Sequence, residues 1–349
     1  MKILLLKPSS LGDVIQALPV LRLLKKWRPD ARVYWWLQTE LLPLLEGDPD
    51  LAGLIPFDRR QWARPRHWGQ LWTTLRDLRR QRFDWVIDLQ CLARSGAVAW
   101  LANGRLLAGL DDHREGARGF YDIIVPRATW HTHAVEWYLA VLKHLAVPVN
   151  RPFVWLPPRP AERDEIMRRH PDTGDQWVVL APGARWPTKR WPVEHFQQLV
   201  RLLAARRPGL RLVLLGGPDD QDTARAIAAA APAACLDLAG RTSLPQMIEW
   251  IRRADAMVTN DTGPMHAAAA LRKPTLALFG PTEPRRTGPY GQPANVLQVQ
   301  LECVPCLRGD CRLAQPIECL RRLRPEMVAA RLFELLDRPA APEEWVINL

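Results

Sequence analysis

Four segments of this chain place residues able to do chemistry where a predicted strand turns into a predicted helix. The first is KPSSLGD at residues 7–13. Its glycine permits a tight turn, and the start of the helix offers free backbone N–H groups to an anion. Asp13 sits where a helix N-cap is expected, so a purely structural capping role is one interpretation of this residue.

The second segment, TNDTGPMH at residues 259–266, has the pattern of a phosphate cradle. Pro264 is well placed as the first helical residue. Thr262 and Gly263 would present a hydroxyl and backbone N–H groups at the positive end of a helix dipole, where phosphate binds. His266 lies one turn further along and is predicted to face the same end. A core or capping role is the alternative for this histidine.

Two more strand ends carry charged residues. In APGARWPTKRWP, residues 181–192, Lys189 supplies a point charge suited to pyrophosphate. The alternative is a solvated basic loop packed by its two tryptophans. In GGPDD, residues 216–220, acids at the start of a helix can accept hydrogen bonds from ribose hydroxyls. They also favour a helix N-terminus without any ligand.

Two other stretches stand out by composition. Residues 59–82 hold eight arginines and one acid, with three tryptophans between them. Guanidinium groups match phosphate oxygens and tryptophan suits a membrane interface, so Arg64 and Arg66 are predicted to face an anionic acceptor or membrane. A solvated helix face is the alternative. Near the C-terminus, four cysteines predict a structural zinc or iron site, with a reduced, partly buried cluster as the alternative: Cys303, Cys306, Cys311 and Cys319.

The elements that must position these residues alternate between apolar strands and amphipathic helices, which predicts βαβ units and parallel sheets. Strands are expected at 2–7, 32–37, 85–89, 177–181, 211–216, 256–260 and 275–279, and helices at 14–27, 73–82, 133–145, 193–206, 219–230, 264–271 and 325–336. Pro19 is expected to kink the first helix. The proline-rich residues 147–160 read as a linker, which predicts two Rossmann-like lobes with a cleft at the carboxyl ends of both sheets.

Length and composition exclude several classes of protein. At 349 residues the chain is expected to form about two domains, since one domain averages roughly 150 residues. A net charge of +11 favours an anionic partner. No apolar run approaches the roughly 18 residues that span a bilayer, and the N-terminus lacks a signal-peptide pattern. These features predict a cytoplasmic chain.

The motifs KPSSLGDVIQALPVL, TKRWP, NDTGPMHAAAAL and ALFGPTEP, in that order, resemble glycosyltransferase family 9, the bacterial lipopolysaccharide heptosyltransferases. The resemblance implies an α/β GT-B fold and inverting transfer of a heptose from ADP-heptose to the inner core of lipid A. It implies an acceptor-binding lobe at 1–150, a nucleotide-sugar-binding lobe at 151–325, and a C-terminal helix and tail at 326–349 that packs back on the first lobe. The residues matching the family are Asp13 as the catalytic base, Lys7 and Ser10 near the acceptor, and Lys189, Asp220, Asp261, Thr262, Gly263 and His266 around the donor.

The chemistry fits this resemblance, because such transfer needs a base and a stabilised diphosphate leaving group. No metal is expected for catalysis, and closure of the lobes is expected to exclude water. The predicted enzyme meets an anionic glycolipid at the cytoplasmic face of the inner membrane. Ala184 and Arg185 stand where some members carry a threonine pair, which leaves the acceptor open. A protein-directed heptosyltransferase is one alternative, and a basic nucleic-acid-binding module is a rival from another class.

Overall fold

The structure is a computed structural model and describes residues 1–58, 68–112, 115–338 and 341–347. The chain forms two compact units. The first unit contains Met1–Pro157 with Glu344–Leu349, and the second contains Pro158–Glu343. Among the described residues, no helix combines the length and apolar character that crossing a bilayer requires.

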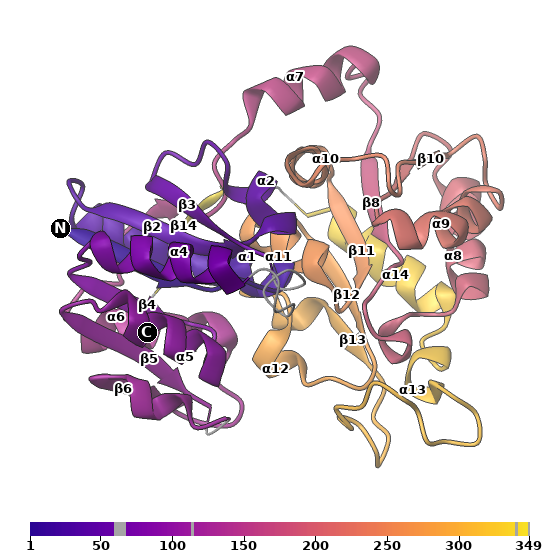
Figure 1. The fold of residues 1–349 in the computed structure, drawn as a ribbon. Coiled ribbons are helices and arrows are strands. Elements are labelled where there is room, and N and C mark those ends of the chain that lie inside the picture. The colour runs from indigo at the N-terminus through magenta and orange to yellow at the C-terminus, as the bar shows by residue number, and fades with distance from the viewer. Residues whose placement is uncertain (59–67, 113–114, 339–340, 348–349) are drawn as a thin grey trace. The chain divides into compact units, whose positions relative to one another are not determined.

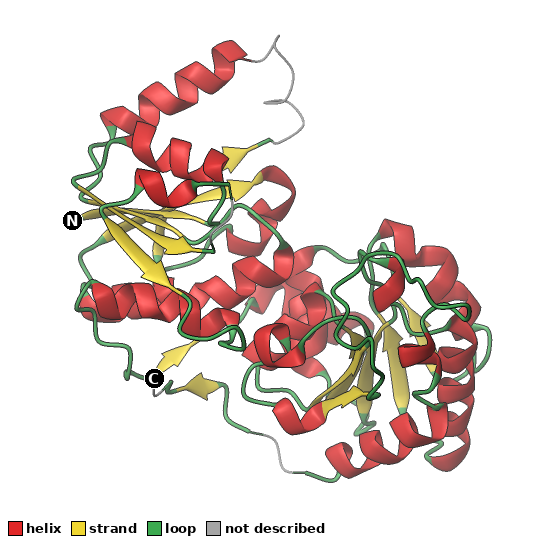
Figure 2. Ribbon diagram, turned by 90° about the horizontal axis from the view of Figure 1, so that it is seen from below, coloured by secondary structure: helices red, strands yellow, loops and turns green. Residues whose placement is uncertain are grey.

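The first unit is built on a six-stranded sheet in the order β3-β2-β1-β4-β5-β6, with every pair parallel (Figure 1). This is the Rossmann strand order. Helices cover both faces of the sheet (Figure 2). The strands are β1 (Lys2–Leu6), β2 (Arg32–Gln38), β3 (Leu51–Phe57), β4 (Trp85–Asp88), β5 (Leu106–Asp111) and β6 (Ile123–Pro126), and the helices are α1 (Leu11–Trp27), α2 (Leu42–Leu45), α4 (Trp68–Arg80), α5 (Ala93–Ala102) and α6 (Ala134–His144).

The second unit repeats the architecture, with a parallel sheet in the order β10-β9-β8-β11-β12-β13. All residues of its three central strands are buried, as expected for strands covered on both faces. The strands are β8 (Trp177–Ala181), β9 (Arg211–Leu214), β10 (Cys235–Asp237), β11 (Ala256–Asn260), β12 (Thr275–Phe279) and β13 (Val296–Gln298), and the helices are α7 (Pro160–Arg169), α8 (Val193–Arg206), α9 (Gln221–Ala228), α10 (Leu244–Arg253), α11 (Gly263–Ala270), α12 (Pro284–Thr287), α13 (Glu318–Arg321) and α14 (Pro325–Leu336).

The last residues of the chain return to the first unit. Strand β7 (Phe153–Val154) pairs antiparallel with β14 (Glu344–Trp345). Helix α14 instead packs in the core of the second unit through Val328 and Leu332. The structure therefore divides the chain after Pro157, where the sequence analysis divided it at 150, and it separates the terminal helix from the tail.

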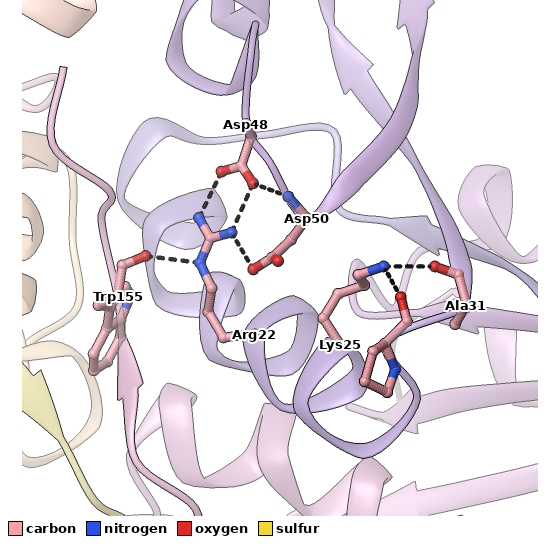
Figure 3. Close-up of polar contacts among 7 residues, drawn as sticks. Arg22, Lys25, Ala31, Asp48, Asp50 and Trp155 are labelled. Atoms are coloured by element: carbon pink, nitrogen blue, oxygen red, sulfur yellow. Dashed lines mark hydrogen bonds and ion pairs between the residues drawn. The ribbon is translucent and has the colours of Figure 1, made fainter. Parts of the chain in front are cut away.

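The first helix and its surroundings are tied together by a buried arginine (Figure 3). Arg22 of α1 forms a bidentate pair with Asp48, at 2.7 and 2.5 Å, and a 2.8 Å contact with Asp50. Its Nε donates to the carbonyl of Trp155 at 3.2 Å, and the Trp155 indole donates to the carbonyl of Ile15 at 2.7 Å. Burial alone lowers the pKa of Arg22, but the two carboxylates outweigh it and the net pKa is raised, so the guanidinium stays charged.

Candidate active site

Asp13 lies in the first turn of α1, just after the turn that follows β1. The N-cap of the helix is Ser10, and Asp13 occupies the third helical position. Its Oδ2 accepts hydrogen bonds from the Ser10 backbone N–H at 3.0 Å and from the Ser10 hydroxyl at 2.6 Å. The prediction that Asp13 is the N-cap is therefore wrong, because the helix begins at Leu11 rather than at Val14. Asp13 instead reaches back to the cap, as an acid at this position does.

Two residues hold the other oxygen of this carboxylate. The Tyr138 hydroxyl donates to Asp13 Oδ1 at 3.4 Å, and Lys7 Nζ lies 3.9 Å from the same atom. The Lys7 side chain is only 5% exposed, whereas that of Asp13 is 41% exposed. Ser10 thus holds one oxygen of the carboxylate by hydrogen bonds, and Tyr138 and the Lys7 ammonium lie near the other oxygen. Part of the side chain remains open to a substrate hydroxyl, as a general base requires.

Lys7 is held in turn by groups of the first unit. Its ammonium donates to the carbonyl of Leu89 at 2.9 Å and lies 4.9 Å from the centre of the Tyr138 ring. Burial alone lowers the pKa of Lys7, but the net pKa is raised by its partners, among which Asp13 is the carboxylate. Lys7 therefore carries its positive charge at neutral pH. Its burial favours a role in positioning Asp13 over a direct contact with an acceptor.

In the second unit, Lys189 and Asp261 meet at the carboxyl edge of the sheet. Lys189 Nζ lies 2.7 Å from Asp261 Oδ2, and the Thr282 hydroxyl donates to the same oxygen at 2.7 Å. The Lys189 side chain is 20% exposed and that of Asp261 is 7% exposed. Asp261 therefore fixes the ammonium from its buried side. The Lys189 ammonium also lies 4.9 Å from the centre of the Trp186 ring.

An asparagine holds the Lys189 loop against the end of β11. The Asn260 side-chain NH2 donates to the carbonyl of Pro182 at 2.6 Å, and the Asn260 side-chain oxygen accepts from the backbone N–H of Trp191 at 3.1 Å. Asn260 is fully buried. It therefore closes the 181–192 loop at both ends and sets the place from which Lys189 extends.

The predicted phosphate cradle follows directly. Helix α11 begins at Gly263, with Thr262 as its N-cap in an extended conformation. Thr262 and Gly263 are half-exposed, and the Thr262 hydroxyl makes no capping hydrogen bond. His266 is buried, 9% exposed, one turn into the helix. The start of α11 thus presents its backbone N–H groups next to the Lys189–Asp261 pair, where an anion would be favoured by both.

Asp220 lies against the same loop region. It ends the short helical turn Pro218–Asp220, and its Oδ2 accepts from the Gly217 N–H at 2.9 Å. A Cβ on Gly183 would collide with the Asp220 carboxylate, and one on Gly216 would come within 2.9 Å of it. Glycine at these two positions therefore allows the carboxylate to sit between the loops that follow β8 and β9.

The remaining predicted site residues are two arginines and four cysteines. Arg64 and Arg66 lie outside the described residues. Among the described residues, no group of three or more His, Cys, Asp or Glu side chains is arranged to hold a metal ion, so the metal site predicted at the four cysteines is not found. Cys303 is exposed, whereas Cys319 is buried in the core of the second unit, where burial raises its pKa to about 11. The Cys311 sulfur accepts from the Ile317 N–H at 3.3 Å.

Three residues of the two clusters were missed by the sequence analysis. Tyr138 lies in a predicted helix, but nothing in its surrounding sequence links it to Asp13, 125 residues away. Thr282 belongs to the motif ALFGPTEP, which was noted without a role for its hydroxyl. Asn260 was seen only as part of the cradle segment, and its side-chain partners come from another loop.

Two Rossmann-like units, one carrying the Asp13 carboxylate and the other the predicted phosphate cradle, are the architecture expected of an enzyme that acts on a nucleotide-linked substrate. A family model described as glycosyltransferase family 9 (heptosyltransferase) matches residues 71–316. Lipopolysaccharide heptosyltransferase 1 of Pseudomonas aeruginosa is 33% identical in an alignment that covers 97% of this chain and 99% of that relative.

Solved structures agree with this match. The Escherichia coli ADP-heptose lps heptosyltransferase II has a TM-score of 0.77 and 26% identity, covering 96% of this chain and 98% of that one. The E. coli heptosyltransferase WaaC with ADP has a TM-score of 0.75 and 26% identity, covering 96% and 100%. The chain belongs to glycosyltransferase family 9. It is a glycosyltransferase of the GT-B fold, which confirms the predicted family, fold and enzyme class.

Proposed function

We propose that this enzyme transfers a heptose from ADP-heptose to the inner core of lipopolysaccharide, with inversion at the anomeric carbon. The observation that carries the proposal is the Lys189–Asp261 pair beside the start of α11, which we infer to be the diphosphate site. The relatives of this chain are named heptosyltransferases. One of those relatives has been solved with ADP. The protein-acceptor alternative gains no support from these names.

The second unit binds the donor in this proposal. The Lys189 ammonium and the N–H groups at Thr262 and Gly263 would offset the charge of the diphosphate as it leaves. His266 supports the same cradle from within the first turn of α11. Asp220 would accept hydrogen bonds from the ribose hydroxyls. Because a lysine and a helix N-terminus supply the positive charge, we expect no catalytic metal to be needed.

The first unit binds and activates the acceptor. The acceptor hydroxyl gives its proton to the Asp13 carboxylate while its oxygen forms a bond to the anomeric carbon. The bond between that carbon and the donor phosphate oxygen breaks, and ADP leaves with the electron pair. Ser10, Tyr138 and Lys7 hold the carboxylate in place during this step. We further propose that the enzyme works at the cytoplasmic face of the inner membrane, where it meets an anionic glycolipid.

The choice of donor is tested by measuring ADP or UDP release with a lipid A inner-core acceptor. ADP-heptose, UDP-glucose and UDP-N-acetylglucosamine are compared in parallel at one concentration. We expect release from ADP-heptose alone, and only when the acceptor is present. Faster release of UDP from a UDP-sugar than of ADP from ADP-heptose would show that the enzyme uses another donor.

The donor site makes a separate prediction for Lys189. Lys189→Met should raise the Kd for ADP by about 10- to 100-fold, because a hydrogen bond to a charged group is worth about 1.5–3 kcal/mol. A bulky residue at Gly263 should also weaken ADP by blocking the approach to the backbone. Isothermal titration calorimetry measures both effects.

Adenosine, which lacks the diphosphate, is the matched ligand for this test. Its affinity should be unchanged in Lys189→Met. Arg225→Met, which removes an exposed cation of the same unit, should leave ADP affinity intact. If both site variants bound ADP with unchanged affinity, or lost as much affinity for adenosine as for ADP, the diphosphate could not bind at Lys189 and Gly263.

A further inference from the structure

The outer surface of α4 and α5 carries two large aromatic side chains that the core does not use. Trp72 of α4 is 65% exposed and Trp100 of α5 is 59% exposed. The two helices pack against each other in the first unit. Exposed tryptophans on two helices that contact each other make this part of the unit a candidate interaction site. We call this surface the α4–α5 face: Trp72, Thr73, Leu75, Arg76, Arg79, Trp100 and Leu101.

A groove runs along this face beside Trp72. Its volume is about 380 Å³, and its walls combine apolar side chains with two guanidinium groups. Leu75 lines the groove, is buried and belongs to the core cluster of the unit, while Leu101 packs against that cluster. Arg76 and Arg79 line the groove. An apolar groove with cations in its wall matches a lipid, in which an apolar chain adjoins an anionic phosphate.

Helix α4, which carries these two arginines, has a net positive charge. The segment Trp68–Arg80 carries Arg76, Arg79 and Arg80 against a single acid, Asp77. Arg80 lies 3.7 Å from Asp77 in an exposed pair, which contributes little to stability. A surface of this kind attracts anionic headgroups, and tryptophans beside it favour the boundary between water and lipid.

We propose that the α4–α5 face docks on an anionic bilayer, with Trp72 and Trp100 in the headgroup region and a lipid acyl chain in the groove. Arg76 and Arg79 contact lipid phosphates. The choice of a bilayer over a protein partner rests on the positive charge of the face and on the proposed function, in which the acceptor is a glycolipid. The docking itself requires neither donor nor acceptor.

Sedimentation with vesicles tests the docking on the full chain. Vesicles of phosphatidylethanolamine with phosphatidylglycerol are compared with vesicles of phosphatidylcholine. Arg76→Glu/Arg79→Glu should lower binding to the anionic vesicles at least about tenfold, since each basic residue near an anionic surface adds to attraction. Trp72→Ala/Trp100→Ala should lower binding about tenfold as well, and should remove the part that persists in high salt.

Matched controls separate a local effect from a change in overall charge. Arg163→Glu/Arg169→Glu makes the same charge change on exposed residues of α7 in the second unit. Trp130→Ala removes another exposed tryptophan of the first unit. Both controls should bind vesicles as the wild type does. Equal losses in controls and α4–α5 variants, or undiminished binding by the α4–α5 variants, would overturn the proposal.

Two further readouts distinguish this proposal from the proposed function. Brominated lipids should quench the fluorescence of the wild type more than that of Trp72→Phe/Trp100→Phe, and equal quenching would contradict the insertion of these rings. Transfer to an inner-core acceptor without acyl chains should be unchanged in the arginine variant. If the wild type did not transfer heptose from ADP-heptose, the proposed function would be rejected. The membrane proposal would stand, because vesicle binding is measured without substrates.

Discussion

Replacing Asp13 by asparagine should lower kcat by at least roughly 10²-fold, the smallest effect expected for loss of a general base. Asparagine has the same size, and its side-chain oxygen can still accept hydrogen bonds from Ser10. The fold of the α1 start should therefore persist, while the ability to take a proton is lost. Initial rates of ADP release, with ADP affinity measured by calorimetry, check this expectation.

Controls for this substitution come from the same turn. If Asp13 served only the helix start, the variant would keep its activity, because asparagine can still accept the hydrogen bonds from Ser10. Ser10→Ala removes the hydroxyl donor to the carboxylate and should reduce kcat far less than Asp13→Asn does. Near-normal turnover by a folded Asp13→Asn enzyme would reject the base assignment.

Replacing Arg22 by methionine should lower the free energy of unfolding of the first unit by about 3–5 kcal/mol, the usual cost of breaking a buried ion pair. Methionine fills most of the volume but leaves Asp48, whose side chain is 2% exposed, without its cation. The Trp155 carbonyl also loses its donor. Denaturant titration followed by circular dichroism measures the change.

A second variant identifies the cause of that loss. Arg22→Met/Asp48→Leu should recover part of the stability, because an apolar pair no longer leaves a buried charge unpaired. Arg163→Met, at an exposed pair on α7, should change stability by less than about 1 kcal/mol. A loss in Arg22→Met no larger than in Arg163→Met would show that the buried network contributes little.

Seven of the interior strands could be predicted from the sequence, whereas the interior strand β5 and the edge strands were not predicted. The run WVVLA is buried along its whole length, and KILLL is buried after its lysine, so the apolar character of both runs can be recognised without any context. The edge strand β10 has no buried residue, and β6 ends in a proline. An edge strand is partly solvated, as in β3, where only Phe57 is buried, and its apolar pattern is accordingly weak.

The candidate site shows the same division between local and distant information. Glycine turns and helix starts mark Asp13, Lys189 and Gly263, because these positions depend on local chain geometry. The sequence did not show that Ser10 rather than Asp13 is the N-cap, because serine and aspartate are equally good N-cap residues. The contact of Tyr138 with Asp13 depends on the packing of α6 beside α1, which no local pattern encodes. The cysteine spacing suggested a metal, but the fold buries Cys319 in the core.

The transfer of heptose to the inner core is tested most directly by mass spectrometry of the acceptor. The wild-type enzyme is incubated with ADP-heptose and a lipid A inner-core acceptor that lacks heptose, with Asp13→Asn as the parallel sample. We expect the acceptor to gain heptose in the wild-type sample, with an equal amount of ADP released, and to remain almost unchanged in the variant. If the acceptor gained no heptose from the folded wild-type enzyme, the proposed function would be contradicted. If it gained as much heptose with Asp13→Asn, the role of Asp13 as the base would be contradicted.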